Sequence, residues 1–203
     1  MSPTLILLAG PNGAGKSTLY QTRVAPAFAG PFINADMIQR DRLRDPSPQA
    51  AYQAAEIAAE RRSEMLAKGA DFVTETVFSH PSKLELAKEA RQLGYTVWVM
   101  HVGVDSADLS VARVAYRAAT GGHSVPETKI RERYDRTAQL VPAAVKLADK
   151  GLVYDNSVAA QSPKLVLTFD QGRLVDVRPG PPGWIRRDYE ADLSAYREPG
   201  SPR

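Results

Sequence analysis

The segment GPNGAGKS at residues 10–17 follows the pattern G-x-x-x-x-G-K-[ST], which is typical of loops that bind phosphate groups. An apolar run at residues 4–9 precedes it and a helix is expected after it, which is the setting that the pattern requires. Glycines let the loop wrap its backbone N–H groups around a phosphate, Lys16 supplies a positive charge, and the hydroxyl of Ser17 is a ligand for Mg²⁺. We therefore predict a nucleoside triphosphate site. Its expected contacts are Gly10, Asn12, Gly13, Ala14, Gly15, Lys16, Ser17 and Thr18.

Two carboxylates at the ends of predicted strands are candidates for acid–base chemistry. Asp36 follows the short strand expected at residues 32–34, and Glu75 follows the strand expected at residues 71–74. Because ligands bind at the carboxyl ends of the strands in a doubly wound sheet, both side chains should face the same cleft as the phosphate loop. A kinase needs a carboxylate to orient an acceptor hydroxyl and take its proton. Two other roles stay open: Asp36 could cap the next helix, and Glu75 could form a structural ion pair.

Arginines gather in two predicted helices, and their positions on each helix suggest which of them face inward. In the helix expected at residues 106–118, we take the buried stripe to be Leu109, Ala112 and Tyr116. At roughly 100° per residue, Arg113 then projects about 40° from Leu109. Arg117 follows one turn later, at the edge of the stripe. A charge directed inward needs an anionic partner, so this helix is predicted to contact the nucleotide.

The second arginine helix is expected at residues 127–150. Its apolar stripe comprises Ile130, Tyr134, Val141, Ala144 and Ala148. Arg133 lies close to the margin of this stripe, Arg131 lies further away, and Arg136 faces solvent. We therefore expect Arg133, rather than Arg131, to contact the transferred phosphate.

The glycine pair at residues 121–122 separates the two helices and should hinge a small lid at about residues 119–128. A lid between two arginine helices, together with acceptor carboxylates, favours a small-molecule kinase over a motor or a switch. The guanine-binding pattern N-K-x-D of GTPases is absent from the sequence.

Strands and helices are predicted to alternate along most of the chain. Strands are expected at residues 4–9, 32–34, 71–74, 95–102 and 152–154, and further helices at residues 50–68 and 81–93. This alternation predicts an α/β protein with the P-loop NTPase fold, in which helices cover both faces of a mostly parallel, five-stranded sheet. A β-hairpin is expected at about residues 164–178 and should extend the sheet. We expect one domain at residues 1–179 and a tail at residues 180–203, in which Trp184 packs and the last residues are disordered.

Composition excludes several other classes of protein. The chain has 203 residues, a formal net charge of +3 and no cysteine. Disulfides, thiolate metal sites and a cysteine nucleophile are therefore excluded, and the three histidines lack the spacing of a zinc site. The net charge is too small to predict a nucleic-acid-binding surface. No apolar segment is long enough to span a membrane, so we expect a cytoplasmic protein.

Five segments, in their order and spacing, resemble the zeta-toxin family of P-loop kinases. They are LAGPNGAGKST, FINAD, FVTET, RVAYRAATGGHSVPETKIRERYDR and LVYDNS, and together they extend from residue 4 to residue 157. The resemblance implies ATP-dependent phosphorylation of a hydroxyl group in UDP-N-acetylglucosamine or a related nucleotide sugar. It also implies a toxic activity and a possible separate antitoxin protein.

The same resemblance implies roles for individual residues. Asp36 takes the position of the catalytic base, and Glu75 and Thr76 take positions that line the substrate pocket. The lid arginines that contact phosphates correspond to Arg117 and to either Arg131 or Arg133. Arg113 resembles the lid arginine that packs on adenine, and we count both Arg113 and Arg131 among the expected ATP contacts.

Two alternatives stay open at this point. The acceptor could be a nucleoside, an antibiotic or the end of a nucleic acid, and a nucleic acid would require a continuous basic groove. The chain could also be a regulatory module that binds ATP without catalysing a reaction.

Overall fold

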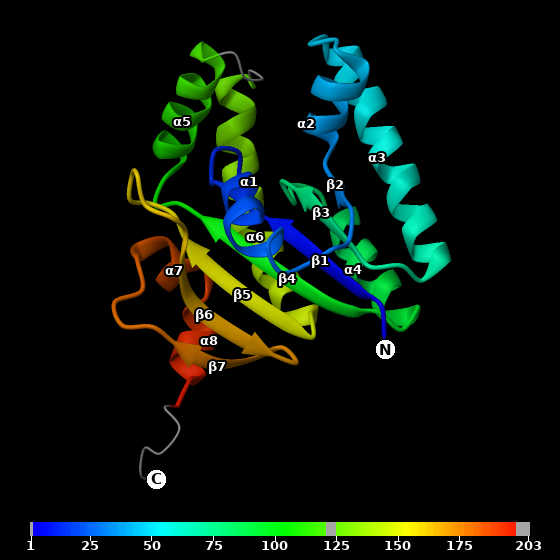
Figure 1. Ribbon diagram of the computed structural model, residues 1–203. Coiled ribbons are helices and arrows are strands. Elements are labelled where there is room, and N and C mark those ends of the chain that lie inside the picture. Colours follow the sequence, from blue (N-terminus) through cyan, green and yellow to red (C-terminus); the bar gives the residue numbers. More distant parts are fainter. Residues whose placement is uncertain (1, 121–124, 198–203) are drawn as a thin grey trace.

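The computed structural model describes residues 2–120 and 125–197 of the chain. Its centre is a parallel sheet with the strand order β2-β3-β1-β4-β5 (Figure 1). The strands are β1 (Thr4–Ala9), β2 (Phe32–Ile33), β3 (Phe72–Thr76), β4 (Thr96–Gly103) and β5 (Lys150–Asp155). All residues of β1 after Thr4 are buried, as expected for a central strand that is covered on both faces. The predicted fold class and its five-stranded parallel sheet are confirmed.

A hairpin extends this sheet beyond β5. β6 (Lys164–Asp170) pairs antiparallel with β5, and β7 (Arg173–Val177) pairs antiparallel with β6, so that the described residues form one seven-stranded sheet. Gln171 and Gly172 connect the two strands with φ angles of 47° and 74°. Positive φ at both central residues is what a type I′ hairpin turn requires. The predicted hairpin is therefore confirmed.

Helices cover both faces of the sheet (Figure 1). The helical segments are α1 (Lys16–Leu19), η1 (Tyr20–Val24), α2 (Ala35–Met37), η2 (Ile38–Leu43), α3 (Pro48–Lys68), α4 (Ser82–Gln92), α5 (Ala107–Ala119), α6 (Glu127–Leu147), α7 (Gly183–Asp188) and α8 (Glu190–Ala195), where η1 and η2 are π-helical. On one face, α3, α4 and the second half of α6 pack against Leu5 and Leu7. On the other face, α1 packs against Ile6 and Leu8. The described helices include none whose length and hydropathy would let it span a lipid bilayer.

The segment after the hairpin is packed onto the sheet. Trp184, Ile185 and Tyr189 are at most 3% exposed and belong to the larger apolar core. The indole Nε1 of Trp184 donates a hydrogen bond of 2.8 Å to Asp155 Oδ1, at the end of β5. The indole ring lies so close to Gly103 that a Cβ atom there would approach it to 2.4 Å. The predicted packing of Trp184 is confirmed, and the tail expected from residue 180 is helical over most of its described length. Residues 198–203, where we expected disorder, lie outside the described residues.

His101, in the buried part of β4, is joined to this C-terminal segment. Its side chain is 2% exposed, and its Nδ1 atom lies 2.7 Å from the hydroxyl oxygen of Tyr189. Burial, and to a smaller extent the charge of Lys16, lowers the pKa of His101 from 6.5 to about 3. The imidazole is therefore neutral in the folded protein at neutral pH.

We expect this neutral histidine to make the fold less stable on mild acidification. Between pH 6.5 and pH 3 the unfolded chain binds a proton at His101 that the folded chain excludes, so the free energy of unfolding decreases as the pH falls. At about 1.4 kcal/mol per pKa unit, the loss at pH 5 relative to pH 7 is about 2 kcal/mol. Urea unfolding of the wild type and of His101→Asn, whose amide can still bond Tyr189, measures this contribution. The stability difference between them should change by that amount between pH 7 and pH 5, and an unchanged difference would contradict a buried neutral imidazole.

Candidate active site

The phosphate loop at residues 10–17 follows the carboxyl end of β1. Glycines occupy the positions where its backbone turns most sharply. Gly10, Gly13 and Gly15 have φ angles of 144°, 72° and 96°, which favour glycine over all other residues. A Cβ atom at Gly10 would approach the carbonyl oxygen of Val102 to 2.0 Å. At Gly15 it would approach the side-chain amide of Asn156 to 2.3 Å. The loop therefore rests directly on β4 and on the residues after β5.

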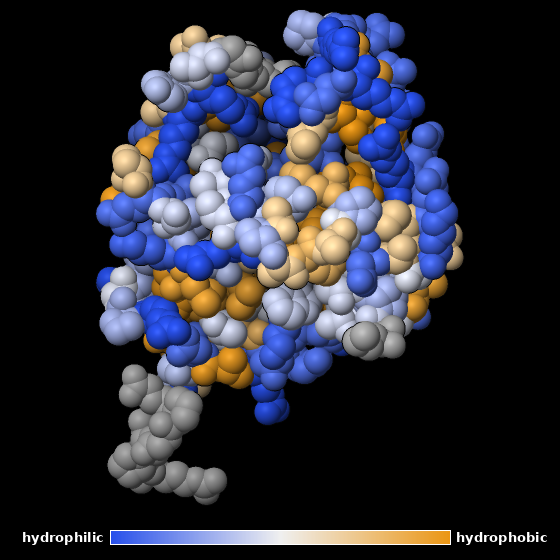
Figure 2. All heavy atoms as spheres, viewed as in Figure 1, coloured by the Kyte–Doolittle hydropathy of each residue, from blue (hydrophilic) through white to orange (hydrophobic). Residues whose placement is uncertain are grey.

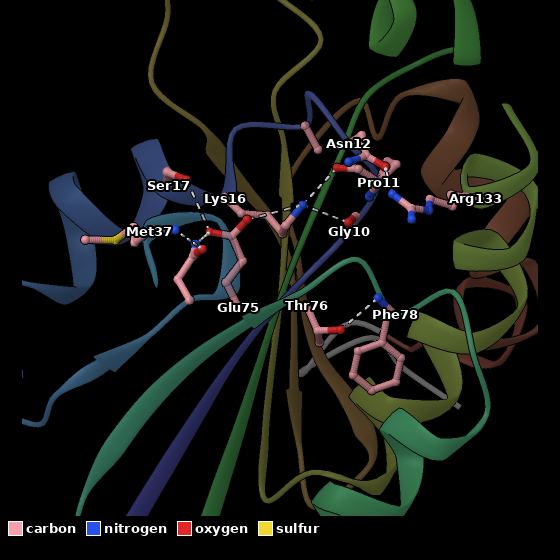
Figure 3. Close-up of polar contacts among 12 residues, drawn as sticks. Gly10, Pro11, Asn12, Lys16, Ser17, Met37, Glu75, Thr76, Phe78 and Arg133 are labelled. Atoms are coloured by element: carbon pink, nitrogen blue, oxygen red, sulfur yellow. Dashed lines mark hydrogen bonds and ion pairs between the residues drawn. The ribbon is translucent and has the colours of Figure 1, made fainter. Parts of the chain in front are cut away.

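Lys16 is folded back onto this loop (Figure 3). Its ammonium donates hydrogen bonds of 3.0 Å to the carbonyl oxygens of Gly10 and Pro11, and it lies 3.6 Å from Glu75 Oε1. Burial lowers the pKa of Lys16, while the charges of Glu75 and Asp36 act in the opposite direction and the charge of Arg117 adds to the lowering. These residues therefore influence one another electrostatically around the position where phosphates would bind.

Glu75 joins the phosphate loop to β2 and β3. It is paired with Leu8 in the register of β3 and β1, which places it beside the start of the loop. Its Oε2 atom accepts hydrogen bonds from Ser17 Oγ at 3.2 Å and from Asn34 Nδ2 at 2.8 Å (Figure 3). Glu75 thus forms an ion pair, the alternative role that we considered for it, and its partner Lys16 belongs to the phosphate site. Asn34 was not among the predicted site residues, although its place directly after a strand and before a helix is typical of a capping residue.

Asp36 lies in the first turn of α2 and is exposed. The capping role considered for it belongs to Asn34, whose Oδ1 accepts a hydrogen bond of 3.1 Å from the backbone of Met37. Asp36 lines a cavity of about 540 Å³ together with Glu75 and Thr76. The Thr76 hydroxyl also accepts a bond of 3.1 Å from the backbone N–H of Phe78. Asp36 is therefore available to a molecule in this cavity.

The cavity lies between α2 and α3 on one side and the start of α6 on the other, with the end of β3 and the start of α4 at its base. The molecular surface is hollowed between these helices, and the rim of the hollow is largely hydrophilic (Figure 2). Asn12 of the phosphate loop is among the lining residues. The cavity and the phosphate loop thus form one continuous site.

The arginines of α6 lie in different surroundings. Arg133 lines the cavity, and its Nη1 atom lies 3.4 Å from Asn12 Oδ1, to which it donates a hydrogen bond. Arg131 forms ion pairs with Asp108 at 2.7 Å and Glu127 at 2.9 Å, outside the cavity. Arg136 is 60% exposed and lies 3.8 Å from Glu132.

The stripe predicted for α5 is wrong, although its arginines still lie near the site. Tyr116 is 75% exposed, whereas Ser110 and Val114 are buried. The reason is that this helix packs on the glycine loop: a Cβ atom at Gly13 would approach the Ser110 carbonyl oxygen to 2.9 Å. The face of α5 that packs on the loop is therefore the one that carries Ser110 and Val114.

The two arginines of α5 differ in their surroundings. Arg113 is partly buried beside Gly13, and its Nη2 atom lies 3.5 Å from the carbonyl oxygen of Ser157, at the limit of a hydrogen bond. Arg117, one turn later, is exposed and acts on Lys16 through its charge. Of the lid expected at residues 119–128, residues 121–124 lie outside the described residues.

Asn156, directly after β5, contacts the phosphate loop. Its Nδ2 atom donates a hydrogen bond of 2.8 Å to the carbonyl oxygen of Ala14, and it packs against Gly15. Of the other predicted contacts, Ser17 and Thr18 are exposed at the start of α1.

A G-x-x-x-x-G-K-[ST] loop at the carboxyl end of a parallel α/β sheet, followed directly by a helix, defines the class of P-loop NTPases. Arginines and a carboxylate beside a cavity that opens onto the loop make this chain kinase-like within the class. The model of the Zeta toxin family matches residues 1–161, and the chain belongs to this family.

The chain is also similar to other known proteins. A protein of Haemophilus influenzae is 27% identical over 139 residues, which are 66% of this chain and 94% of that protein. A structure of the PezAT chromosomal toxin–antitoxin system of Streptococcus pneumoniae aligns with a TM-score of 0.60 and 15% identity, over 82% of this chain and 72% of that chain. A chain of the AvrRxo1-ORF1:-ORF2 complex with ATP aligns with a TM-score of 0.69 and 13% identity, over 98% of this chain and 66% of that chain. At these identities the structures support the fold alone.

Proposed function

We propose that this protein transfers the γ-phosphoryl group of ATP to a hydroxyl group of a nucleotide sugar such as UDP-N-acetylglucosamine. The observation that carries the proposal is the cavity of about 540 Å³, because Asp36 and Arg133 both line it and Asn12 of the phosphate loop borders it. A volume of this size suits a metabolite larger than a simple sugar. The ATP present in the AvrRxo1-ORF1:-ORF2 complex supports the choice of nucleotide.

In this proposal each residue has one task during the transfer. The backbone amides of the loop and Lys16 hold the β- and γ-phosphates, and Arg113 packs on the adenine. Asp36 orients the acceptor hydroxyl and takes its proton as the acceptor oxygen bonds to phosphorus and the bond to ADP breaks. Arg117 and Arg133 stabilise the charge of the transferring group.

The residues around Ser17 fit Mg²⁺, which the class of protein implies. Ser17 Oγ and Glu75 Oε2 are oxygen donors that lie 3.2 Å apart. Within residues 2–120 and 125–197, no group of three His, Cys, Asp or Glu side chains could hold a metal ion. Mg²⁺ in kinases is typically held by one or two side chains and by the phosphates of the nucleotide. When bound, it would neutralise charge on the β- and γ-phosphates.

We also propose that a separate antitoxin protein binds this chain. PezAT is a toxin–antitoxin system, and AvrRxo1-ORF1 is found in a complex with AvrRxo1-ORF2, which supports the proposal. We further propose a cytoplasmic location, where ATP and nucleotide sugars would both be available.

Mass spectrometry of reaction products tests the proposed function. The purified protein is incubated with ATP, Mg²⁺ and one acceptor at a time: UDP-N-acetylglucosamine, UDP-glucose, a nucleoside, an aminoglycoside or a 5′-hydroxyl oligonucleotide. We expect a nucleotide sugar to gain one phosphoryl group. Phosphorylation of another acceptor alone would replace the nucleotide sugar, and ATP binding without any phosphorylated product would favour a regulatory module.

A further inference from the structure

Two cations that line the cavity beside Asp36 have no carboxylate partner among the residues that the structure describes. Arg62 comes from α3 and Lys83 from the first turn of α4, and both side chains are partly buried. Among the described residues, neither one forms an ion pair, whereas exposed cations nearby do: Lys88 lies 2.9 Å from Glu85, and Lys68 lies 3.8 Å from Glu64.

The surroundings of both side chains disfavour their charged forms. Burial lowers the pKa of Arg62, and both burial and the charge of Arg62 lower the pKa of Lys83. Lys83 also lies in the first turn of an 11-residue helix, where the helix dipole is positive. Partly dehydrated like charges normally persist where an anion is bound. No acidic side chain of the described residues compensates them, so the anion would have to come from a ligand.

One face of α3 extends this arrangement along the cavity. Tyr52, Ala55, Ala58 and Arg62 follow one another at intervals of three or four residues, and all of them line the cavity. The ten residue-to-residue steps from Tyr52 to Arg62 correspond to about 15 Å of helix. The alanines between them leave room for an elongated molecule.

We propose that Arg62 and Lys83 form an anion-binding subsite that holds an oxyanion group of the acceptor, separate from the phosphate loop that holds ATP. The guanidinium of an arginine can bind two oxygens of a phosphate or carboxylate at once, and a lysine adds a compact positive charge. This inference rests on the proposed function, because it assigns an anionic group to the molecule that Asp36 would activate. A phosphate, a diphosphate and a carboxylate share the required chemistry.

Binding measurements with the phosphate loop filled test the subsite. The protein is saturated with a non-hydrolysable ATP analogue and Mg²⁺, and then titrated with pyrophosphate, glucose 1-phosphate, glucuronate or neutral glucose. We expect pyrophosphate or glucose 1-phosphate to bind and glucose not to bind. In the variant Arg62→Gln/Lys83→Gln this affinity should fall at least about tenfold, the loss expected when a charged partner is removed. Binding of glucuronate alone would identify a carboxylate subsite. Pyrophosphate binding that is equal in wild type and variant would overturn the proposal, as would the absence of any anion binding by the wild type.

The control is Arg61→Gln, which removes one charge from the same helix at an exposed position outside the cavity. It should bind all probes like the wild type.

Thermal unfolding separates a binding role of Arg62 from a structural one. Without ligand, Arg62→Gln should raise the melting temperature by about 2–4 °C, since it relieves repulsion. Adding pyrophosphate should raise the melting temperature of the wild type but not that of Arg62→Gln. A lower melting temperature without ligand, with the pyrophosphate increase unchanged, would show a structural role and contradict the subsite.

These outcomes are distinguishable from failure of the proposed function. If no acceptor is phosphorylated but the double variant loses pyrophosphate binding, the result supports the subsite and contradicts the kinase proposal. If a nucleotide sugar is phosphorylated and the double variant has the wild-type KM for it, the result contradicts the subsite and supports the kinase proposal. If both are correct, the KM of the anionic acceptor should rise at least about tenfold in the double variant, while ATP binding stays unchanged.

Discussion

Arg133→Gln is expected to lower kcat by about 10³–10⁵-fold, the range found for arginines that stabilise a transferring phosphoryl group. Arg133 lines the cavity of about 540 Å³ and donates a hydrogen bond of 3.4 Å to Asn12 of the phosphate loop. It is thus placed between the two proposed substrates, and its charge would act mainly in the transition state. The KM of ATP should therefore change little. Steady-state kinetics with the acceptor found by the product assay measure both quantities.

The same helix offers a matched control for this prediction. Arg131 is two residues away, but its guanidinium is paired with Asp108 and Glu127 on the surface. Since exposed ion pairs contribute at most about 1 kcal/mol to stability, Arg131→Gln should fold and react like the wild type. If Arg131→Gln lost activity and Arg133→Gln kept it, the roles that we propose for the two residues would be reversed.

Asp36→Asn is expected to slow phosphoryl transfer by about 10²–10⁴-fold, the usual contribution of a general base. Asparagine has the same size as aspartate but cannot take the acceptor proton at neutral pH. The start of α2 should stay intact, because Asn34 and not Asp36 caps that helix. ATP binding should also persist, since Asp36 is not part of the phosphate loop.

Single-turnover kinetics, with enzyme in excess over ATP, measure the transfer step of Asp36→Asn directly. Asp41→Asn is a suitable control, because Asp41 is also exposed but pairs with Arg40 at 2.6 Å and does not line the cavity. Transfer at the wild-type rate in Asp36→Asn would exclude Asp36 as the base. Slow transfer in both variants would indicate a general effect of charge.

Local patterns in the sequence were enough to predict the main elements of the fold. The apolar runs predict the buried parallel strands, and the Gly-rich loop after the first strand predicts the phosphate site. The structure also places Arg133 in the cavity and Arg131 on the surface, which the apolar stripe of α6 had indicated. Each of these predictions depends on residues that are close together in the chain.

The contacts that complete the site join distant segments and could not be predicted in this way. Glu75 bonds Asn34 across 41 residues and Ser17 across 58, and Asn156 bonds Ala14 across 142 residues. No periodicity relates such positions, because the topology of the sheet brings them together. The buried stripe predicted for α5 was wrong for a related reason, since this helix packs on the phosphate loop, which is distant in the sequence.

The C-terminal segment has a consequence for how this chain could have evolved. The family match ends at residue 161, but Phe169, Ile185 and Tyr189, which are fully buried in the larger core, all lie beyond it. The Tyr189 hydroxyl bonds His101 within the central sheet. The segment that the family model matches and the segment that forms the larger core therefore have different boundaries. A recombination event that exchanged residues 1–161 alone would separate this core from part of its own interior, so we expect both parts to have been inherited together.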